Sequence, residues 1–311
     1  MYVYFKLLFF FLPCNLQNGY PMKRFTFLFF GVFVFSLTTT SAQNYAYGIN
    51  PYDNHLATFD IDNLEVISEV EITTPGETVN SGNGLAWHPT NGKLYTILKI
   101  AGESTRFLAT IIPSTGVATL IGDTGEKLAG ITFGSDGTLY AVSGDGGNCQ
   151  ECLFTLDINN ASLTFKRNLG AGSDGEVICF NPDDGLIYHG SGRNTNNAWE
   201  SIDPVTNNKT SIPITGFDWD ELFGLLYIGN NTFLASNLDL ELIEIKTDGS
   251  STRLGSVTSA MDVETMYFRG FVFTTPPFVI PTLSQWGILA LGMLTLIFGV
   301  VMIRERKTIL T

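Results

Sequence analysis

The sequence predicts an all-β protein, a five-bladed β-propeller, and three observations support this prediction. One hairpin recurs along the chain, and its equivalent positions Trp87, Phe133, Phe180 and Ile228 are spaced 46, 47 and 48 residues apart. Two further apolar segments follow each copy, which gives four strands per repeat, the content of one propeller blade. Between residues 43 and 272 there is almost no run of helical periodicity longer than one or two turns.

Each copy of the hairpin consists of an apolar strand, a polar turn and a second apolar strand. The four copies are Gly84 to Ile97, Gly130 to Val142, Val177 to Gly190 and Leu225 to Ser236. Three of the turns contain Asn91-Gly92, Asp136-Gly137 and Asp184-Gly185, pairs that accept the positive φ of tight hairpins. These turns are the strongest local evidence for strand pairing.

The two ends of this region together supply the fifth blade. Tyr45 to Ile49, Leu56 to Asp60 and Glu65 to Val70 match the second, third and fourth strands of a repeat. The missing first strand is expected at Glu264 to Phe268, while Phe271 to Phe273 is either an additional edge strand or the start of a linker. Pairing of N- and C-terminal strands would close the propeller and cover its exposed edges.

Charge argues against a nucleic-acid partner. The 311-residue chain has a formal net charge of −13, and residues 43 to 280 hold 11 Lys and Arg against 29 Asp and Glu, a difference of −18. Such a surface repels phosphate backbones.

The N-terminus has the three parts of a secretory signal peptide. Basic Met22-Lys23-Arg24 precedes the apolar run Phe25 to Leu37, and Thr40 and Ala42 are small residues at the cleavage positions. We therefore expect residues 1–42 to be a signal peptide read by the Sec export machinery, with cleavage between Ala42 and Gln43 and translation starting at Met22. An uncleaved signal anchor is the alternative.

The C-terminus predicts a membrane segment. Residues 273–279 form a Pro-containing linker, residues 286–303 are apolar and long enough for one transmembrane helix, and Arg304 to Lys307 are largely basic. The basic end is expected in the cytoplasm, which places the propeller outside.

Two family resemblances follow from these motifs. Residues 280–307 resemble the IPTL-CTERM protein-sorting domain, whose IPTLxxWG signature and basic end match Ile280, Pro281, Thr282, Leu283, Trp286, Gly287, Arg304 and Arg306. The resemblance implies an exosortase-like transpeptidase as partner, which would remove the helix and pass the propeller to the cell surface or extracellular matrix. Permanent anchoring in the inner membrane is the alternative. The repeats resemble NHL-like or lactonase-like bacterial propellers.

Cys149 and Cys152 are separated by two residues in a long polar loop. In an exported protein this spacing favours a local disulfide, because the compartment is oxidising.

Acidic residues gather in the loops of one propeller face, where these folds bind ligands. They could hold a cation, with Ca²⁺ as the expected ion, or form only a solvated rim. The candidates are Asp174, Glu176, Asp220, Glu221, Asp262 and Glu264. His189 is the candidate catalytic base. Tyr52, Trp199 and Trp219 are expected to be exposed aromatics suited to sugar or peptide contact, with blade packing as the alternative.

These features predict an exported cell-envelope propeller that binds a glycan or protein as a surface or matrix module. The competing hypothesis is a metal-dependent hydrolase or lyase that uses His189 and the acidic loops. The two differ in whether Glu176, Glu221, Glu264 and His189 converge on one point.

Overall fold

The computed structural model describes most of the predicted propeller region. The described residues are 45–49, 53–170, 176–193, 197–217, 219–239, 241–259, 265–266 and 268–274. The predicted signal peptide, linker residues 275–279, sorting signal and helix 286–303 lie outside them. Within the described residues every regular element is a strand, and no helix there is long and apolar enough to cross a membrane.

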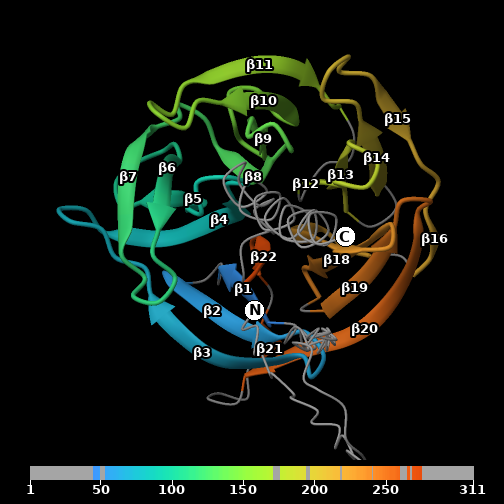
Figure 1. Ribbon diagram of the computed structural model, residues 1–311, viewed down its shortest axis with the longest axis horizontal. Coiled ribbons are helices and arrows are strands. Elements are labelled where there is room, and N and C mark those ends of the chain that lie inside the picture. Colours follow the sequence, from blue (N-terminus) through green and yellow to red (C-terminus); the bar gives the residue numbers. More distant parts are fainter. Residues whose placement is uncertain are drawn as a thin grey trace, which may run out of the picture. The chain divides into compact units, whose positions relative to one another are not determined.

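The strands form five blades around a common axis, which confirms the predicted fold class (Figure 1). Blade two consists of β4 (Val79–Trp87), β5 (Leu94–Ile100), β6 (Phe107–Ile111) and β7 (Ala118–Asp123). Blade three consists of β8 (Leu128–Phe133), β9 (Leu139–Ser143), β10 (Cys152–Leu156) and β11 (Leu163–Asn168).

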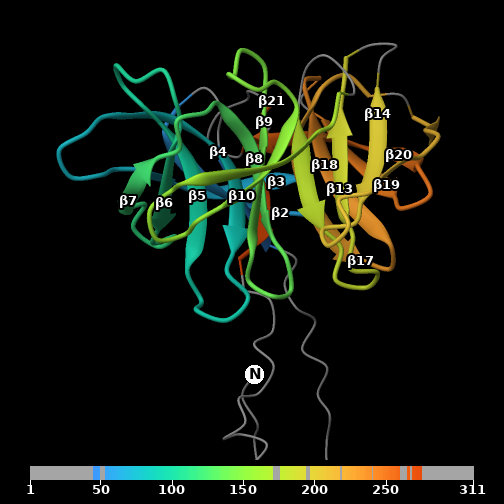
Figure 2. The same cartoon turned by 90° about the horizontal axis from the view of Figure 1, so that it is seen from above.

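The next two blades repeat this order. Blade four consists of β12 (Val177–Phe180), β13 (Ile187–Ser191), β14 (Ala198–Ile202) and β15 (Lys209–Ser211). Blade five consists of β17 (Leu222–Gly229), β18 (Thr232–Asn237), β19 (Glu241–Lys246) and β20 (Ser250–Ser259), and the short β16 (Thr215–Gly216) pairs parallel with β20. Consecutive strands within each blade are antiparallel, so successive loops alternate between the two faces (Figure 2).

Blade one is built from both ends of the propeller region, as predicted, but its first strand is not the expected one. The order is β22 (Phe271–Phe273), β1 (Tyr45–Ile49), β2 (His55–Asp60) and β3 (Glu65–Glu71). The predicted first strand Glu264 to Phe268 is wrong, because β21 (Thr265–Met266) within it pairs with β20. Phe271–Phe273 instead pairs antiparallel with β1.

Blade one is also joined to blade five along their outer strands. Thr258 and Ser259 of β20 pair parallel with Glu65 and Val66 of β3, so the two blades form one continuous sheet. The ring is therefore closed in two places: the inner strand β22 pairs with β1, and the outer strand β20 pairs with β3. Both cover backbone groups that would otherwise lie at a free edge.

The hairpin turns have the predicted conformation. Gly92, Gly137 and Gly185 have φ of 67°, 83° and 76°, in the left-handed region that glycine adopts without a steric penalty. Asn230 and Asn231 occupy the same region with φ of 52° and 58°. Each turn reverses the chain between the first and second strands of a blade.

The core lies between neighbouring blades, where their faces pack together. Trp199 of β14 meets Phe233 of β18 edge to face, with ring centroids 5.5 Å apart, and so fastens blade four to blade five. Phe59 of β2 stacks on Phe268 at 4.8 Å beside Phe271, which fastens the closing segment to blade one. Burial of these aromatic side chains positions the loops of the two faces.

Candidate functional site

A central cavity of about 270 Å³ opens on the face where acidic loops were predicted. Its lining comes from all five blades, through β4, the β5–β6 loop, β8, the β9–β10 loop, the segments before β12 and β17, and the segment before β22. The cavity thus exists only because the blades are arranged in a closed ring. Its volume is slightly below the range of about 300 to 1,000 Å³ that is usual for small-molecule sites.

Three cationic side chains line this cavity. Arg106 precedes β6, Lys127 precedes β8, and Arg269 lies between β21 and β22. Burial lowers the pKa of Arg106, and the positive charge of Arg269 lowers it further. The Nε atoms of Arg106 and Arg269 are both buried and have no hydrogen-bond partner among the described residues.

Arg269 is held in place by an aromatic ring and an amide. Its guanidinium carbon lies 4.9 Å from the centre of the Phe223 ring, within the range of a cation–π interaction. Its Nη1 lies 3.5 Å from Oδ1 of Asn83, whose Nδ2 donates to the Leu128 carbonyl at 3.1 Å. The backbone is fixed as well, because Arg269 N–H donates to the Ile49 carbonyl and its own carbonyl accepts from Gly84 N–H, both at 2.9 Å.

Two predicted cation ligands line the same cavity, but their surroundings are not purely acidic. Glu176 is buried, and Oε1 of Glu221 lies 3.4 Å from Nη1 of Arg193, whose Nε lies 3.8 Å from Oδ1 of Asp220. Among the described residues, no group of three or more His, Cys, Asp or Glu is arranged to hold a metal ion. Asp174, Asp262 and Glu264 lie outside the described residues, so the cation site stays a prediction.

His189 lies apart from this cavity. It is fully buried in β13, and its Nδ1 is 3.3 Å from Oε2 of Glu200 in β14. Glu200 also lies 2.6 Å from Nζ of Lys209 and accepts a hydrogen bond from Ser211 Oγ at 3.2 Å. Glu200, Lys209 and Ser211 line a second hollow of about 670 Å³, to which His189 does not contribute. The structure therefore brings Glu176 and Glu221 together without His189.

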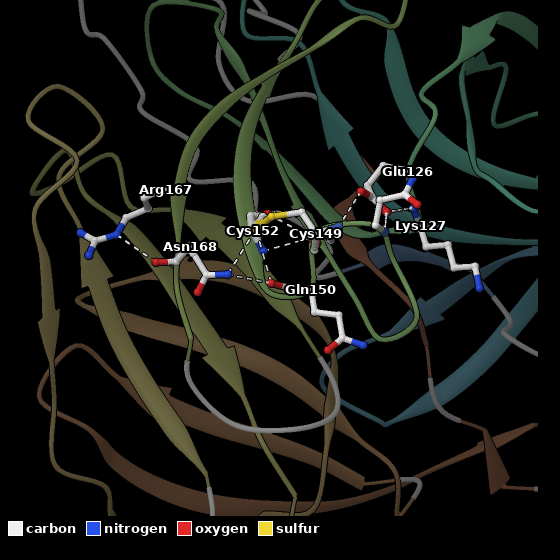
Figure 3. Close-up of a disulfide and its surroundings, with 9 residues drawn as sticks. Glu126, Lys127, Cys149, Gln150, Cys152, Arg167 and Asn168 are labelled. Atoms are coloured by element: carbon white, nitrogen blue, oxygen red, sulfur yellow. Dashed lines mark hydrogen bonds between the residues drawn. A yellow bond between two sulfur atoms is a disulfide. The ribbon is translucent and has the colours of Figure 1, made fainter.

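A disulfide joins Cys149 in the β9–β10 loop to Cys152 at the start of β10 (Figure 3). Beside it, the carboxylate of Glu126 accepts hydrogen bonds from the backbone N–H groups of Lys127, Asn148 and Cys149, at 2.9, 2.7 and 3.0 Å. Three donors on one buried carboxylate fix this loop against the segment that contains Lys127. The disulfide and Glu126 therefore shape one wall of the cavity.

The two predicted binding aromatics in the described region are core residues. Trp199 and Trp219 are each 1% exposed, so the expectation that they are exposed is wrong. They pack edge to face on each other between blades four and five, and Trp199 Nε1 donates to the Lys246 carbonyl at 3.1 Å. Tyr52 lies outside the described residues. The remaining cysteine, Cys179, is buried, and burial raises the pKa of its thiol to about 12.

Sequence reasoning did not identify the three cations as site residues. Two features of the sequence could have indicated them. Only 11 basic residues lie between positions 43 and 280, and Arg106, Lys127 and Arg269 each lie close to the end of a strand on the same face.

Together, the strands and the cavity define the class of this protein, a five-bladed β-propeller with a charged central cavity. No protein-family model matches the sequence, and no curated protein matches it. A protein of unknown function from Bacteroides caccae is similar in structure, with a TM-score of 0.48 and 11% identity over 74% of this chain and 98% of that one.

Two further solved structures are similar at the same level. The nidogen/laminin complex gives a TM-score of 0.49 and 12% identity over 71% of this chain and 84% of that chain. TolB from Acinetobacter baumannii gives 0.47 and 14% identity over 69% and 53%.

Proposed function

We propose that this protein is an exported cell-envelope β-propeller that binds a small ligand group in its central cavity and acts as a surface or matrix interaction module. The supporting observation is the cavity, to which all five blades contribute polar and charged side chains. Convergent polar groups in a concave, ring-closed site are typical of ligand binding on propellers. A glycan or protein segment that inserts one small group would fit this volume.

The second part of the proposal concerns the cellular location of the protein and rests on sequence motifs. The signal peptide ending at Ala42 would direct export by the Sec machinery, and the IPTLxxWG motif from Ile280 to Gly287 would present the chain to an exosortase-like enzyme. Cleavage there would release the propeller from its inner-membrane helix to the cell surface or matrix. Mass spectrometry of the mature protein tests this: a form that lacks Leu289 to Thr311 supports sorting, and an intact C-terminus on all molecules contradicts it.

Binding at the cavity is tested by blocking it. Ala129 lines the cavity, and Ala129→Trp would fill part of its volume whatever the ligand's charge. We expect the full-length protein to bind a subset of a glycan array and the Ala129→Trp variant to lose that binding. The matched control is Val205→Trp, since Val205 is 86% exposed on a distant turn. Equal binding by the two folded variants would contradict a role for the cavity.

A metal-dependent hydrolase or lyase is the second candidate: Glu176, Glu221 and Asp145 line the same cavity, but no three described acidic, His or Cys residues are arranged as a metal site, so a metal would need ligands outside the described residues. Carboxylate oxygens are the ligands that Ca²⁺ prefers. Native mass spectrometry with and without chelator distinguishes the candidates: one Ca²⁺ per chain, removed only by chelator, favours the enzyme. A metal-free protein with unchanged thermal stability favours the binding module.

A further inference from the structure

The central cavity brings three basic side chains together with three carboxylates, Asp145, Glu176 and Glu221, in a domain that is otherwise strongly acidic. Residues 43 to 280 contain 11 basic and 29 acidic residues, yet three of the 11 basic side chains line one cavity of about 270 Å³. Three other basic residues contact carboxylates: Lys209 contacts Glu200, Arg253 contacts Glu241, and Arg193 contacts Asp220 and the cavity-lining Glu221. No ion pair joins Arg106, Lys127 or Arg269 to a described carboxylate within salt-bridge distance.

Two of these cations lie close enough to interact unfavourably. Arg106 and Arg269 are both partly buried, and each leaves a buried Nε–H without a described acceptor. Burying like charges and unsatisfied donors together costs folding free energy, so some other interaction is expected to compensate. A bound oxyanion would offset the repulsion between the two positive charges, because a guanidinium attracts a carboxylate or phosphate group and donates hydrogen bonds to it.

Arg269 is already oriented for this role before any ligand binds. Phe223 supports the flat face of its guanidinium, and Asn83 lies at one Nη atom, so few rotamers are left to order on binding. Preorganisation of this kind increases affinity by lowering the entropic cost of association. Lys127 adds a third positive charge to the lining, and its Nζ lies next to Gly146 in the disulfide-containing loop.

The other side chains of the cavity indicate what the anion is attached to. Asp145 and Glu176 line it together with Asn83, so hydroxyl donors and an acidic group could be bound at once. A carboxylate next to several hydroxyls is the chemistry of an acidic sugar, and one sugar ring suits the small volume. We infer that Arg106 and Arg269, assisted by Lys127, bind the carboxylate of a uronate-type sugar; this inference rests on the proposed binding function.

The test is calorimetric titration of the full-length protein with four probes: D-glucuronate, D-glucose, inorganic sulfate and inorganic phosphate. D-glucuronate is expected to bind at least about tenfold more tightly than D-glucose, because only the acid satisfies the arginine pair. It should also bind more tightly than sulfate or phosphate, which lack the hydroxyl groups. Equal binding of glucose and glucuronate would overturn the inference, and so would tighter binding of either inorganic ion.

Variants locate the binding. Arg106→Gln is expected to weaken D-glucuronate binding about tenfold or more, and Arg106→Lys to weaken it less, since charge remains but the forked donor geometry is lost. Arg253→Gln is the matched control, because it removes the same charge from an exposed ion pair between Arg253 of β20 and Glu241 of β19. Circular dichroism and the melting temperature confirm that each variant is folded. An equal effect of Arg253→Gln and Arg106→Gln would refute the assignment.

Failure of this inference is distinguishable from failure of the proposed function. If a neutral glycan binds, is blocked by Ala129→Trp and is unaffected by Arg106→Gln, the cavity is a binding site but not for an acid. If Ala129→Trp changes no binding at all, the cavity is not the binding site.

Discussion

The central cavity and the hollow of blade four both contain a basic side chain near carboxylates, but they treat that charge in opposite ways. In blade four, Lys209 lies 2.6 Å from Glu200 and 2.5 Å from the Leu169 carbonyl, and Glu200 also contacts His189. In the cavity, the Nε atoms of Arg106 and Arg269 have no described acceptor. Blade four thus neutralises its buried basic side chain internally, whereas the proposed ligand would neutralise the two arginines of the cavity.

The largest effect on stability is expected when a substitution breaks the network of Glu200, Lys209 and His189 in blade four. Glu200→Ala leaves Lys209 without its carboxylate in a largely buried position, and we expect the free energy of unfolding to fall by about 3 kcal/mol. Urea denaturation measures this change. The control is Glu241→Ala, whose partner Arg253 is exposed and where a loss of about 0.5 kcal/mol is expected. Similar losses at both sites would remove the distinction.

The same network predicts a pH dependence. Burial by itself raises the pKa of Glu200, but hydrogen bonds from His189 and Lys209 outweigh it and leave the pKa below the usual value. Its stabilisation is therefore present above the unfolded pKa, about 4.3, and is lost as the pH falls further. Stability of the wild type should drop more steeply below about pH 4 than stability of Glu200→Gln. Parallel curves would show that the network contributes no such dependence.

A smaller effect is expected where the ring closes beside Arg269. Gly270 has φ of 100°, and a Cβ there would lie 2.6 Å from Gly84 Cα. Gly270→Ala should therefore cost about 2 kcal/mol and also weaken D-glucuronate binding, because Arg269 shifts with its neighbour. Gly76→Ala is the control: φ is 84°, but nothing lies within 4 Å of the added carbon. A loss no larger than that of the control would argue against close packing at the closure.

The disulfide tests the wall of the cavity. Replacing Cys149 and Cys152 with Ser removes a crosslink across a very short loop, for which loop entropy gives at most about 2 kcal/mol. We expect a drop in melting temperature and weaker glucuronate binding, since the loop lies beside Lys127. If the double Ser variant binds glucuronate as the wild type does, the hydrogen bonds of Glu126 are sufficient to fix this wall of the cavity.

The smallest expected change has the opposite sign. Arg106→Gln removes one of two like charges that interact across the cavity, so the ligand-free protein should become more stable by about 0.5 kcal/mol. Calorimetric melting without ligand measures it. A clear loss of stability would mean that Arg106 is a structural residue, like Lys209, and would end the contrast between the two regions.

The sequence was sufficient to predict the blades because their signals are local. Alternating apolar residues and turns such as Asp136-Gly137 specify hairpins without reference to distant segments. The closing strand was misassigned because Glu264 to Phe268 and Phe271–Phe273 are both short and apolar, and only pairing with β1 selects the second. A local pattern does not contain that information.

The site was predicted less well for the same reason. Glu176 and Glu221 were recognised from their loops and do line the cavity, but Arg106 and Arg269 are far apart in sequence and come together only when the C-terminal segment packs between blades one and two. Trp199 and Trp219 were misjudged because polar neighbours in sequence concealed their packing between blades four and five. Polar loop sequences show where a face lies, not which side chains converge on it.

The position of Arg269 has a consequence for the order in which this protein is made. Arg269 lies on the last described segment of the propeller, held between Ile49 and Gly84 by backbone hydrogen bonds on both sides. During synthesis four blades can form before this residue emerges, but the binding cavity is complete only when β22 joins β1. Ligand affinity is therefore a direct report of ring closure, and a chain truncated before residue 269 would keep most of its sheets and lose its site.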